Sequence, residues 1–312
     1  MKKINNIKIV STGKYLPKKV VSNTDLEKIV ETSDEWIFSR TGIKNRRYVE
    51  EESVNDMAYL SAVDAINKVN YDVNNIDLII VATCSSVRRV PSVASLVQAK
   101  LGLNHKAITC FDINAACTGF IYALDIAAQL LNNSTFKGAL IIGSETLTKF
   151  TDFTDRNTCV LFGDGAGAML IENTNMMKPA YFFNASTGDF EDTLVCDDYI
   201  KMDGRKVYSF ATKAITSAVL KVLSDLEINM EDVEKIIPHQ ANQRIIETAS
   251  KNLNVDLNKF FINIENYGNT SAASVIIAID EYLAESEKLE DKKIVVVGFG
   301  GGFTWGACLL TL

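Results

Sequence analysis

The sequence predicts an α/β protein whose two halves repeat one βα unit. Short apolar runs alternate with segments of helical periodicity, which is the pattern of an α/β sheet. Four runs have the length and composition of strands, and two segments between them have helical spacing. We expect strands at residues 77–83, 107–113, 139–143 and 158–171, and helices at 55–69 and 118–131. After about residue 173 the same order of elements returns.

The repeat is visible in three pairs of segments that keep their order along the chain. IDLIIVAT resembles VEKIIPHQ, FDINAACTGFIYALDIAAQLL resembles INIENYGNTSAASVIIAIDEYL, and ALIIGSE resembles IVVVGFG. In the second pair Cys117 aligns with Asn269. Matched segments in one order predict two copies of a single unit rather than two unrelated domains. We expect one half at residues 1–173, carrying the cysteine, and the other at 174–312, carrying a histidine and an asparagine.

Composition and charge exclude several classes of protein. The 312 residues are 47% apolar and 23% charged, which suits a globular chain with a sizeable core. A net charge of −7 argues against a nucleic-acid or anionic membrane surface, so an acidic partner needs a local basic patch. The N-terminal segment has only a short apolar stretch, and we expect no signal peptide.

The C-terminal segment 294–312 is uncharged and as long as a membrane span. Glycines cluster in its middle, which would make a poor spanning helix. We therefore expect two buried strands, near 294–297 and 307–312, joined by a glycine loop. This GFGGGF loop lacks the spacing of a dinucleotide fingerprint, and the chain has no phosphate-binding G-K-[ST] motif.

The six cysteines form no C-x-x-C pair and have no histidine at metal-binding spacing. We expect no metal site. The thiols are typical of a cytoplasmic protein, reduced and mostly buried, and one of them is a candidate for reactivity.

Three residues at the ends of expected strands are candidates for chemistry. Cys117 lies between a strand and a helix, where oriented backbone amides favour the thiolate; the alternative is a small cysteine packed among alanines. His239 follows the strand that Pro238 ends, and it is either a structural histidine or a proton donor and acceptor. Asn269 opens another helix, as a cap or as an amide donor to an oxyanion. Because ligands bind beyond the carboxyl ends of parallel strands, these residues are expected to share one site with the glycine loop at 298–302.

Together the motifs resemble one family. AACTGF, PHQANQRI, YGNTSAAS and GFGGGFTWGA surround the candidate residues, and TSDEWI, FSRTGI and TDRNTCVLFGDGAGA add further matches. The chain is similar to β-ketoacyl-acyl-carrier-protein synthase III from end to end. The resemblance implies the thiolase fold, an α/β architecture in which two duplicated βα halves form layers in the order α-β-α-β-α. It also implies a cytoplasmic homodimer.

The resemblance implies an acyltransferase that starts fatty-acid biosynthesis by decarboxylative Claisen condensation. Cys117 would take the primer acyl group from acyl-CoA, with the backbone N–H groups of Cys117 and Gly301 as the oxyanion hole. His239 and Asn269 would bind the thioester carbonyl of malonyl-acyl-carrier protein, and Phe299 would stand over its carboxylate. Acyl-CoA is a substrate in this scheme, and no cofactor or metal is implied.

Coenzyme A sites in the family imply that Trp36 and Arg156 sandwich the adenine. The other implied contacts are Thr32, Arg40, Gly204, Tyr208 and Asn242. A capping box from Thr32 to Glu35 would start a helix on which Trp36 and Arg40 share one face.

Arg244 and Lys251 are seven apart on an expected helix, at about residues 241–253. They would project together toward an acidic carrier protein. A solvated helix face is the alternative, and Glu247 between them dilutes the positive charge.

Substrate choice is where the chain departs from its relatives. Val90 stands where an aromatic residue often crosses the dimer and closes the acyl pocket, so we expect longer or branched primers to be accepted. Arg88 and Arg89 favour instead a polar or carboxylated primer, and the segment at 184–203 is shorter than in most relatives. These departures keep open a second function, an acyltransferase or condensing enzyme of a specialised, polyketide-type pathway. A catalytically dead scaffold is a third alternative, which the intact Cys117 disfavours.

Overall fold

The computed structural model describes residues 5–133, 135–174 and 178–312. Its main sheet has nine strands in the order β11-β12-β13-β8-β1-β7-β6-β4-β5. Six of these strands precede the long helix of the second half, in the chain order β1 Asn5–Tyr15, β4 Ile76–Ala82, β5 Thr109–Ile113, β6 Gly138–Glu145, β7 Gly165–Asn173 and β8 Pro179–Ser186. After that helix comes β11 Val233–Pro238. The chain ends on the strands β12 Lys293–Gly300 and β13 Thr304–Thr311. Two small ribbons lie beside the main sheet, formed by β2 Lys19–Ser22 with β3 Asn45–Tyr48 and by β9 Leu194–Cys196 with β10 Ile200–Met202.

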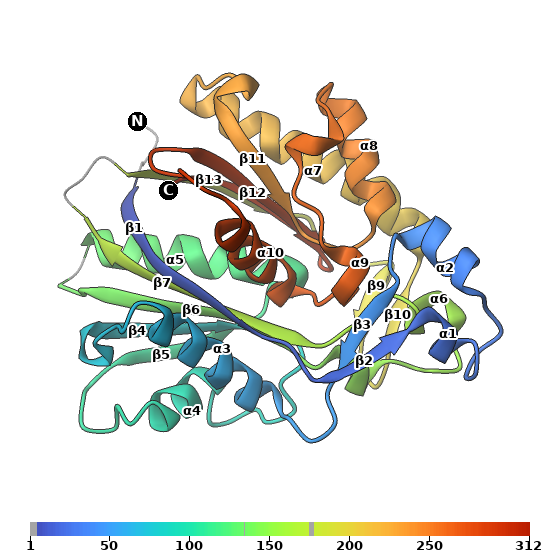
Figure 1. The fold of residues 1–312 in the computed structure, drawn as a ribbon, viewed down its shortest axis with the longest axis horizontal. Helices are drawn as coiled ribbons and strands as arrows, with labels where there is room; N and C mark the ends of the chain where they lie inside the picture. Colours follow the sequence, from blue (N-terminus) through green and yellow to red (C-terminus); the bar gives the residue numbers. More distant parts are fainter. Residues whose placement is uncertain (1–4, 134, 175–177) are drawn as a thin grey trace.

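The helices fall into three groups around the strands. Two pack on the outside of the first-half strands, α3 Val54–Lys68 and α4 Val93–Lys100, and two on the outside of the second-half strands, α7 Gly204–Leu226 and α8 Gln243–Leu253. Between the two sets of strands lie α5 Gly119–Asn133 and α10 Ala272–Glu285. The shorter helices are α1 Asn23–Leu26, α2 Asp34–Thr41, α6 Arg156–Cys159 and α9 Ile264–Tyr267. Figure 1 shows the resulting order of layers, helix, strand, helix, strand, helix, as expected.

The central layer is apolar because both of its helices are buried on nearly every side. Phe120, Leu124 and Ala128 of α5 meet Ile276 and Ile279 of α10 in one cluster of fully buried side chains. Fully burying a Leu, Ile or Phe side chain stabilises a fold by about 1.5–3 kcal/mol. This shared core fixes the first turns of α5 and α10 relative to each other, and the candidate residues Cys117 and Asn269 directly precede those turns.

The strand order has the symmetry that the sequence repeat predicts. β4 and β6 are parallel and β6 and β7 antiparallel; β11 and β12 are likewise parallel and β12 and β13 antiparallel. The two sets meet where β1 pairs with β8. We therefore propose two copies of one unit, at residues 1–173 and 174–312.

Two expected elements differ in the structure. The run at 158–171 is not one strand: its first part is the helix α6, and β7 begins only at Gly165, because Asp155 caps a helical turn there. The C-terminal segment forms the expected antiparallel hairpin, but Gly298 and Gly300 lie within β12 rather than in the loop.

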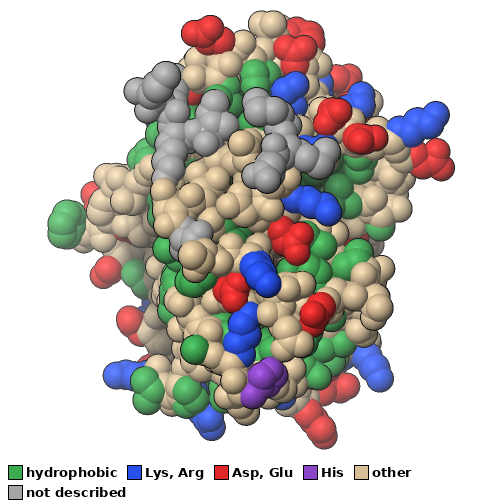
Figure 2. Space-filling model, turned by 90° about the vertical axis from the view of Figure 1, so that its left-hand side faces the viewer, with side chains coloured by type: hydrophobic (Ala, Val, Ile, Leu, Met, Phe, Trp, Pro, Cys, Tyr) green, Lys and Arg blue, Asp and Glu red, His purple; other side chains and the backbone are tan. Residues whose placement is uncertain are grey.

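In the part of the chain that the structure describes, no helix is long and apolar enough to cross a membrane. Figure 2 shows acidic and basic side chains interspersed over one face of the molecule, so that face offers no basic patch to a polyanion.

Candidate active site

Two cavities meet at Cys117. The first, about 480 Å³, is lined by Cys117, His239 and Asn269. The second, about 420 Å³, is lined by Cys117 and by Gly301 of the glycine-rich turn. The topology therefore brings the three candidates, which come from three different elements, to one place, with the thiol between two chambers.

Cys117 lies in a tight 3₁₀ turn, Ala116–Thr118, between β5 and α5. The residue before it, Ala116, has φ of 47°, a conformation that costs a non-glycine residue roughly 1–3 kcal/mol and that clusters at functional sites. The strand β12 lies so close to this turn that residue 300 must be a glycine. A Cβ on Gly300 would lie 2.7 Å from the backbone nitrogen of Cys117, so this turn and that strand fit only if residue 300 has no side chain.

The resting thiol is protonated at neutral pH, contrary to the expected thiolate. Burial raises the pKa of Cys117 to about 12, and the nearby Ser271 hydroxyl offsets this only in part. Desolvation therefore outweighs the stabilisation expected from the backbone amides.

His239 is 1% exposed and directly follows the C-terminal end of β11. Its backbone N–H donates to Val297 O of the neighbouring strand β12 at 2.8 Å. Its Nδ1 lies 2.6 Å from Ser274 Oγ, and the Phe299 ring packs edge-on with centroids 5.2 Å apart. Burial lowers the pKa of His239 to about 3, so the imidazole is neutral at physiological pH.

Asn269 is tied down at its backbone and at its side-chain oxygen. Its N–H donates to Leu161 O, and its carbonyl accepts from Gly163 N. The N–H of Ser271 donates to Asn269 Oδ1 at 2.8 Å. Since the amide oxygen is occupied, the NH₂ group is the part of this side chain left to act as a donor in the first cavity.

An aromatic platform forms part of the lining of the first cavity. The guanidinium carbons of Arg40 and Arg156 lie 4.6 and 4.7 Å from the centre of the Trp36 ring. Trp36 and Arg40 line the cavity, whereas Arg156 is held at the Trp36 ring by that stacking and by a bond from its NH1 to Glu31 O. Such stacking of planar cations on an indole is the arrangement that also accepts a flat aromatic base.

Comparison with known proteins identifies the family. The family model described as 3-oxoacyl-[acyl-carrier-protein (ACP)] synthase III matches residues 111–188, and its C-terminal counterpart matches 223–312. The chain is 50% identical over 307 residues to β-ketoacyl-[acyl-carrier-protein] synthase III of Acholeplasma laidlawii, covering 98% of each. The crystal structure of 3-oxoacyl-[acyl-carrier-protein] synthase III from Aquifex aeolicus superposes with a TM-score of 0.95 at 44% identity, over 98% of this chain and 100% of that one.

The chain belongs to the β-ketoacyl-acyl-carrier-protein synthase III family. It therefore has the thiolase fold and is an acyltransferase, a condensing enzyme of fatty-acid biosynthesis. The priming β-ketosynthase of the R1128 polyketide pathway shares the fold with a TM-score of 0.92, but only 28% of the sequence. The specialised-pathway alternative is accordingly not favoured.

The remaining coenzyme A residues implied by the synthase III family are divided by the structure. Gly204, Tyr208 and Asn242 line the first cavity, and Thr32 does not. The expected capping box is wrong: Ser33, not Thr32, accepts the Trp36 N–H and caps α2, and the Thr32 hydroxyl is buried with no hydrogen-bond partner among the described residues.

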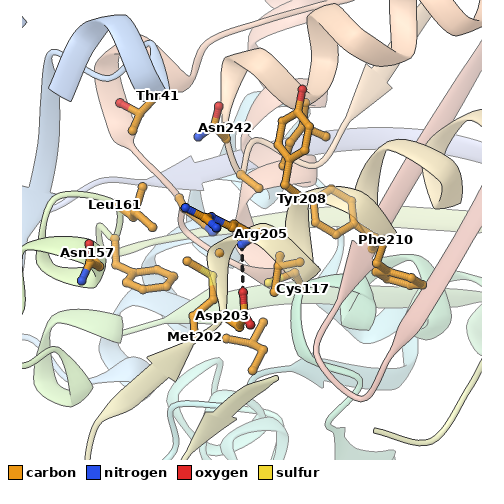
Figure 3. Close-up of a pocket in the computed structure, with 18 of the residues that line it drawn as sticks. Thr41, Cys117, Asn157, Leu161, Met202, Asp203, Arg205, Tyr208, Phe210 and Asn242 are labelled. Atoms are coloured by element: carbon orange, nitrogen blue, oxygen red, sulfur yellow. Dashed lines mark hydrogen bonds between the residues drawn. The ribbon is translucent and has the colours of Figure 1, made fainter. Parts of the chain in front are cut away.

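Arg205 is a cavity residue that the sequence analysis missed. Figure 3 shows Arg205 and Tyr208, both from α7, among the residues that line the first cavity. Asp203 caps α7 by accepting from Arg205 N and Lys206 N, which sets the orientation of this first turn. The available signal was its position next to Gly204.

The second cavity corrects the prediction for the cysteines. Cys159 and Cys308 are buried as expected, but Cys84 and Cys196 are exposed in the single chain and line the second cavity beside Cys117. Behind them Glu145, fully buried, accepts hydrogen bonds from Ser85 Oγ at 2.6 Å and from Cys84 N at 3.2 Å. The sequence spacing could not predict these contacts, because Cys84 and Ser85 follow β4 whereas Glu145 ends β6.

Val90 lies outside both cavity linings and is 81% exposed. Arg244 and Lys251 are exposed on α8, and among the described residues neither forms an ion pair. Glu247 is held by Gln243 Nε2 at 2.9 Å, so it is not engaged with the two cations. Within the described ranges, no group of three or more potential ligands could hold a metal ion.

Proposed function

We propose that the enzyme condenses an acyl-CoA primer with malonyl-acyl-carrier protein, with loss of carbon dioxide, and so starts fatty-acid chains. The observation that supports this most is the position of Cys117 between two cavities. A thiol so placed can hold an acyl chain on one side and receive a thioester on the other.

In the first step the Cys117 sulfur attacks the acyl-CoA carbonyl. The acyl C–S bond to coenzyme A breaks, and the thiol proton leaves with the coenzyme A thiolate, so an acyl-cysteine and free coenzyme A result. The backbone N–H groups of Cys117 and Gly301 are the proposed donors to the oxyanion. Removing one such donor costs about 10²–10³ in rate in comparable sites.

In the second step His239 and Asn269 donate to the thioester oxygen of the malonyl group. Loss of carbon dioxide leaves an enolate that these donors stabilise. The enolate carbon attacks the acyl carbonyl, the bond to Cys117 breaks, and the released thiolate takes a proton from solvent. The apolar ring of Phe299, 3% exposed, disfavours the malonyl carboxylate and favours its loss.

Substrate contacts follow the two cavities. We assign the first cavity and the Trp36 platform to coenzyme A, with Arg40, Arg156, Gly204, Tyr208 and Asn242 as contacts. The exposed cations Arg244 and Lys251 are the proposed docking face for the acidic carrier protein. The second cavity is assigned to the acyl chain. Val90, exposed on its own chain, would reach a partner's cavity in the homodimer that we propose.

The proposed chemistry needs only a thiol and hydrogen-bond donors, and no cofactor or metal takes part in any step. Six free cysteines suit the reducing cytoplasm, where we place the enzyme.

The test is intact-mass analysis after incubation with a panel of acyl-CoAs, followed by malonyl-acyl-carrier protein. We expect one acyl adduct, absent in Cys117→Ala and retained in Cys110→Ala, a cysteine that lines neither cavity. Addition of malonyl-acyl-carrier protein should remove the adduct and yield β-ketoacyl product. No adduct with any primer would contradict the proposal, and an adduct that transfers without condensation would favour a simple acyltransferase.

A further inference from the structure

The hydrogen bond between His239 and Ser274 decides which ring nitrogen of the histidine carries a proton. Ser274 lies in the first turn of α10 and is 2% exposed, and its Oγ is 2.6 Å from His239 Nδ1. The Gln240 N–H also points to this oxygen, at 3.4 Å. Two groups thus approach one hydroxyl, and only one arrangement of protons satisfies all of them.

If Nδ1 carried the proton, Ser274 Oγ would receive two donors and its own O–H would need another acceptor. Among the described residues, Ser274 Oγ has no carbonyl or carboxylate partner. A buried hydroxyl without an acceptor is costly, and buried polar groups rarely remain unpaired. If the hydroxyl instead donates its proton to an unprotonated Nδ1, the Ser274 oxygen is free to accept the Gln240 N–H, and every group has a partner.

We propose that Ser274 is a positioning residue that donates to His239 Nδ1 and holds the imidazole as the Nε2–H tautomer. Nδ1 is occupied on the side of α10, so Nε2 is the nitrogen that faces the first cavity, which His239 lines. The inference rests on the proposed function, in which His239 donates to the malonyl thioester. It adds the device that makes the neutral ring a donor, and it excludes His239 Nε2 as the base for the Cys117 thiol in the resting enzyme.

The same helix start orients the second donor. Ser271, immediately before α10, gives its N–H to Asn269 Oδ1 and leaves the NH₂ group for the cavity. Ser274, three residues on, gives its hydroxyl to His239. One turn of one helix therefore sets the polarity of both donors, and the core contact of α10 with α5 fixes that turn opposite Cys117.

The experiment is ¹⁵N NMR of the imidazole nitrogens. The chain has only two histidines, and His105 is exposed and belongs to neither cavity lining, so His105→Gln leaves His239 as the single signal. We expect a protonated Nε2 and an unprotonated Nδ1 at neutral pH in this protein, without any substrate. A protonated Nδ1 would overturn the inference.

Ser274→Ala in the same background provides the kinetic readout. We expect Cys117 acylation to stay within about twofold and the condensation kcat to fall roughly 10- to 100-fold, the cost that the loss of an orienting partner has for metal-binding histidines. Ser274→Thr, which keeps the hydroxyl, should restore the tautomer and part of the rate. Equal loss of acylation and condensation, or wild-type condensation with an unchanged tautomer, would contradict the role of Ser274. Failure of the proposed function itself would appear differently, as a missing acyl adduct in His105→Gln protein that still shows the Nε2–H signal.

Discussion

The guanidinium carbon of Arg156 lies 4.7 Å from the centre of the Trp36 indole ring, and this contact joins α6 to α2. Arg40, on the same helix as Trp36, adds a second cation over the ring at 4.6 Å. A planar base that enters between Trp36 and Arg156 must displace the guanidinium and then stack on both.

This contact predicts that Trp36→Ala raises the KM for acyl-CoA roughly tenfold or more while kcat for acylation changes little. Base stacking on an aromatic side chain is worth about 1–3 kcal/mol. Arg156→Lys should resemble Arg156→Ala, because the planar fork rather than the charge is needed. Phe38→Ala, an aromatic of the same helix outside both cavities, is the matched control. Acylation kinetics at varied acyl-CoA check this, and an unchanged KM in Trp36→Ala would refute the assignment.

A second prediction concerns the close approach of β12 to the nucleophile. Gly300→Ala places a Cβ 2.7 Å from Cys117 N, so the turn that holds the thiol must move. A misplacement of about 1 Å can cost 10²-fold, and we expect acylation to slow by at least that factor. At Gly188 a new Cβ meets only Phe190 at 3.5 Å, an ordinary contact. Gly188→Ala should therefore acylate normally. The rate of adduct formation by mass spectrometry distinguishes the two variants, and comparable rates in both would show that the turn tolerates the shift.

Much of the fold followed from local pattern. The strand β4, the helix α5 and the C-terminal hairpin have strong apolar periodicity, and the repeat exposed their shared order. The prediction of a single strand at 158–171 was wrong because the apolar residues continue through α6. There the side chain of Asp155 accepts from Asn157 N and starts a helical turn. Periodicity alone does not register such a cap.

The site divided along the same line. Cys117 and His239 were found because each follows a strand, and strand ends converge. Asn269 was found because the repeat aligns it with Cys117, although it follows the short helix α9 rather than the expected strand. Ser274 and Glu145 were not, because their contacts join elements distant in sequence and no spacing rule links them. The protonation state of Cys117 was mispredicted for a related reason: burial, which the whole fold determines, outweighs the local helix start.

The third prediction follows from the buried, neutral His239. Its pKa is about 3 in the folded protein and about 6.5 when unfolded. Between these values the unfolded chain binds a proton that the native chain does not, so this residue makes stability fall as the pH drops below 6.5. Relative to His239→Gln, the wild-type free energy of unfolding should decrease by up to about 1.4 kcal/mol for each pH unit below 6.5. Urea unfolding of both proteins at pH 7.5 and pH 5 measures this difference. Parallel losses in the two proteins would mean that the ring is protonated in the native state.

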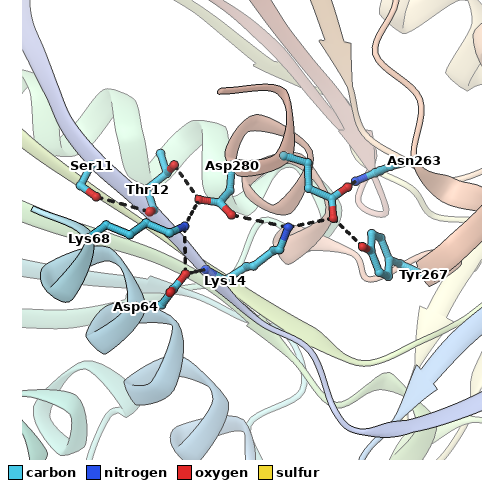
Figure 4. Close-up of polar contacts among 9 residues, drawn as sticks. Ser11, Thr12, Lys14, Asp64, Lys68, Asn263, Tyr267 and Asp280 are labelled. Atoms are coloured by element: carbon cyan, nitrogen blue, oxygen red, sulfur yellow. Dashed lines mark hydrogen bonds and ion pairs between the residues drawn. The ribbon is translucent and has the colours of Figure 1, made fainter. Parts of the chain in front are cut away.

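The last prediction concerns the ion network around Asp280, which connects β1 and α3 to α10. The start of α10 orients the two proposed donors, His239 and Asn269. Asp280 is 3% exposed and accepts from Thr12 Oγ1 at 2.8 Å and Lys68 Nζ at 2.7 Å, with Lys14 Nζ at 3.6 Å (Figure 4). Breaking a fully buried pair costs about 3–5 kcal/mol. Lys14 and Lys68 are 28% and 42% exposed, so water can solvate them when the carboxylate is removed. We therefore expect Asp280→Ala to lower the free energy of unfolding by about 2 kcal/mol.

The exposed pair of Lys28 and Asp25 provides the control. Its N–O distance is 2.8 Å, as short as the contacts of Asp280, but the side chains are 74% and 46% exposed. Lys28→Ala should therefore leave the free energy of unfolding almost unchanged, since solvent screens surface pairs. Urea titration at pH 7.5 measures the loss in free energy of unfolding for Asp280→Ala and Lys28→Ala. Because the two ion-pair distances are nearly equal, a difference between the losses reports the effect of burial. Similar losses in both would show that the position of Asp280 between three elements adds no stability beyond that of a surface ion pair.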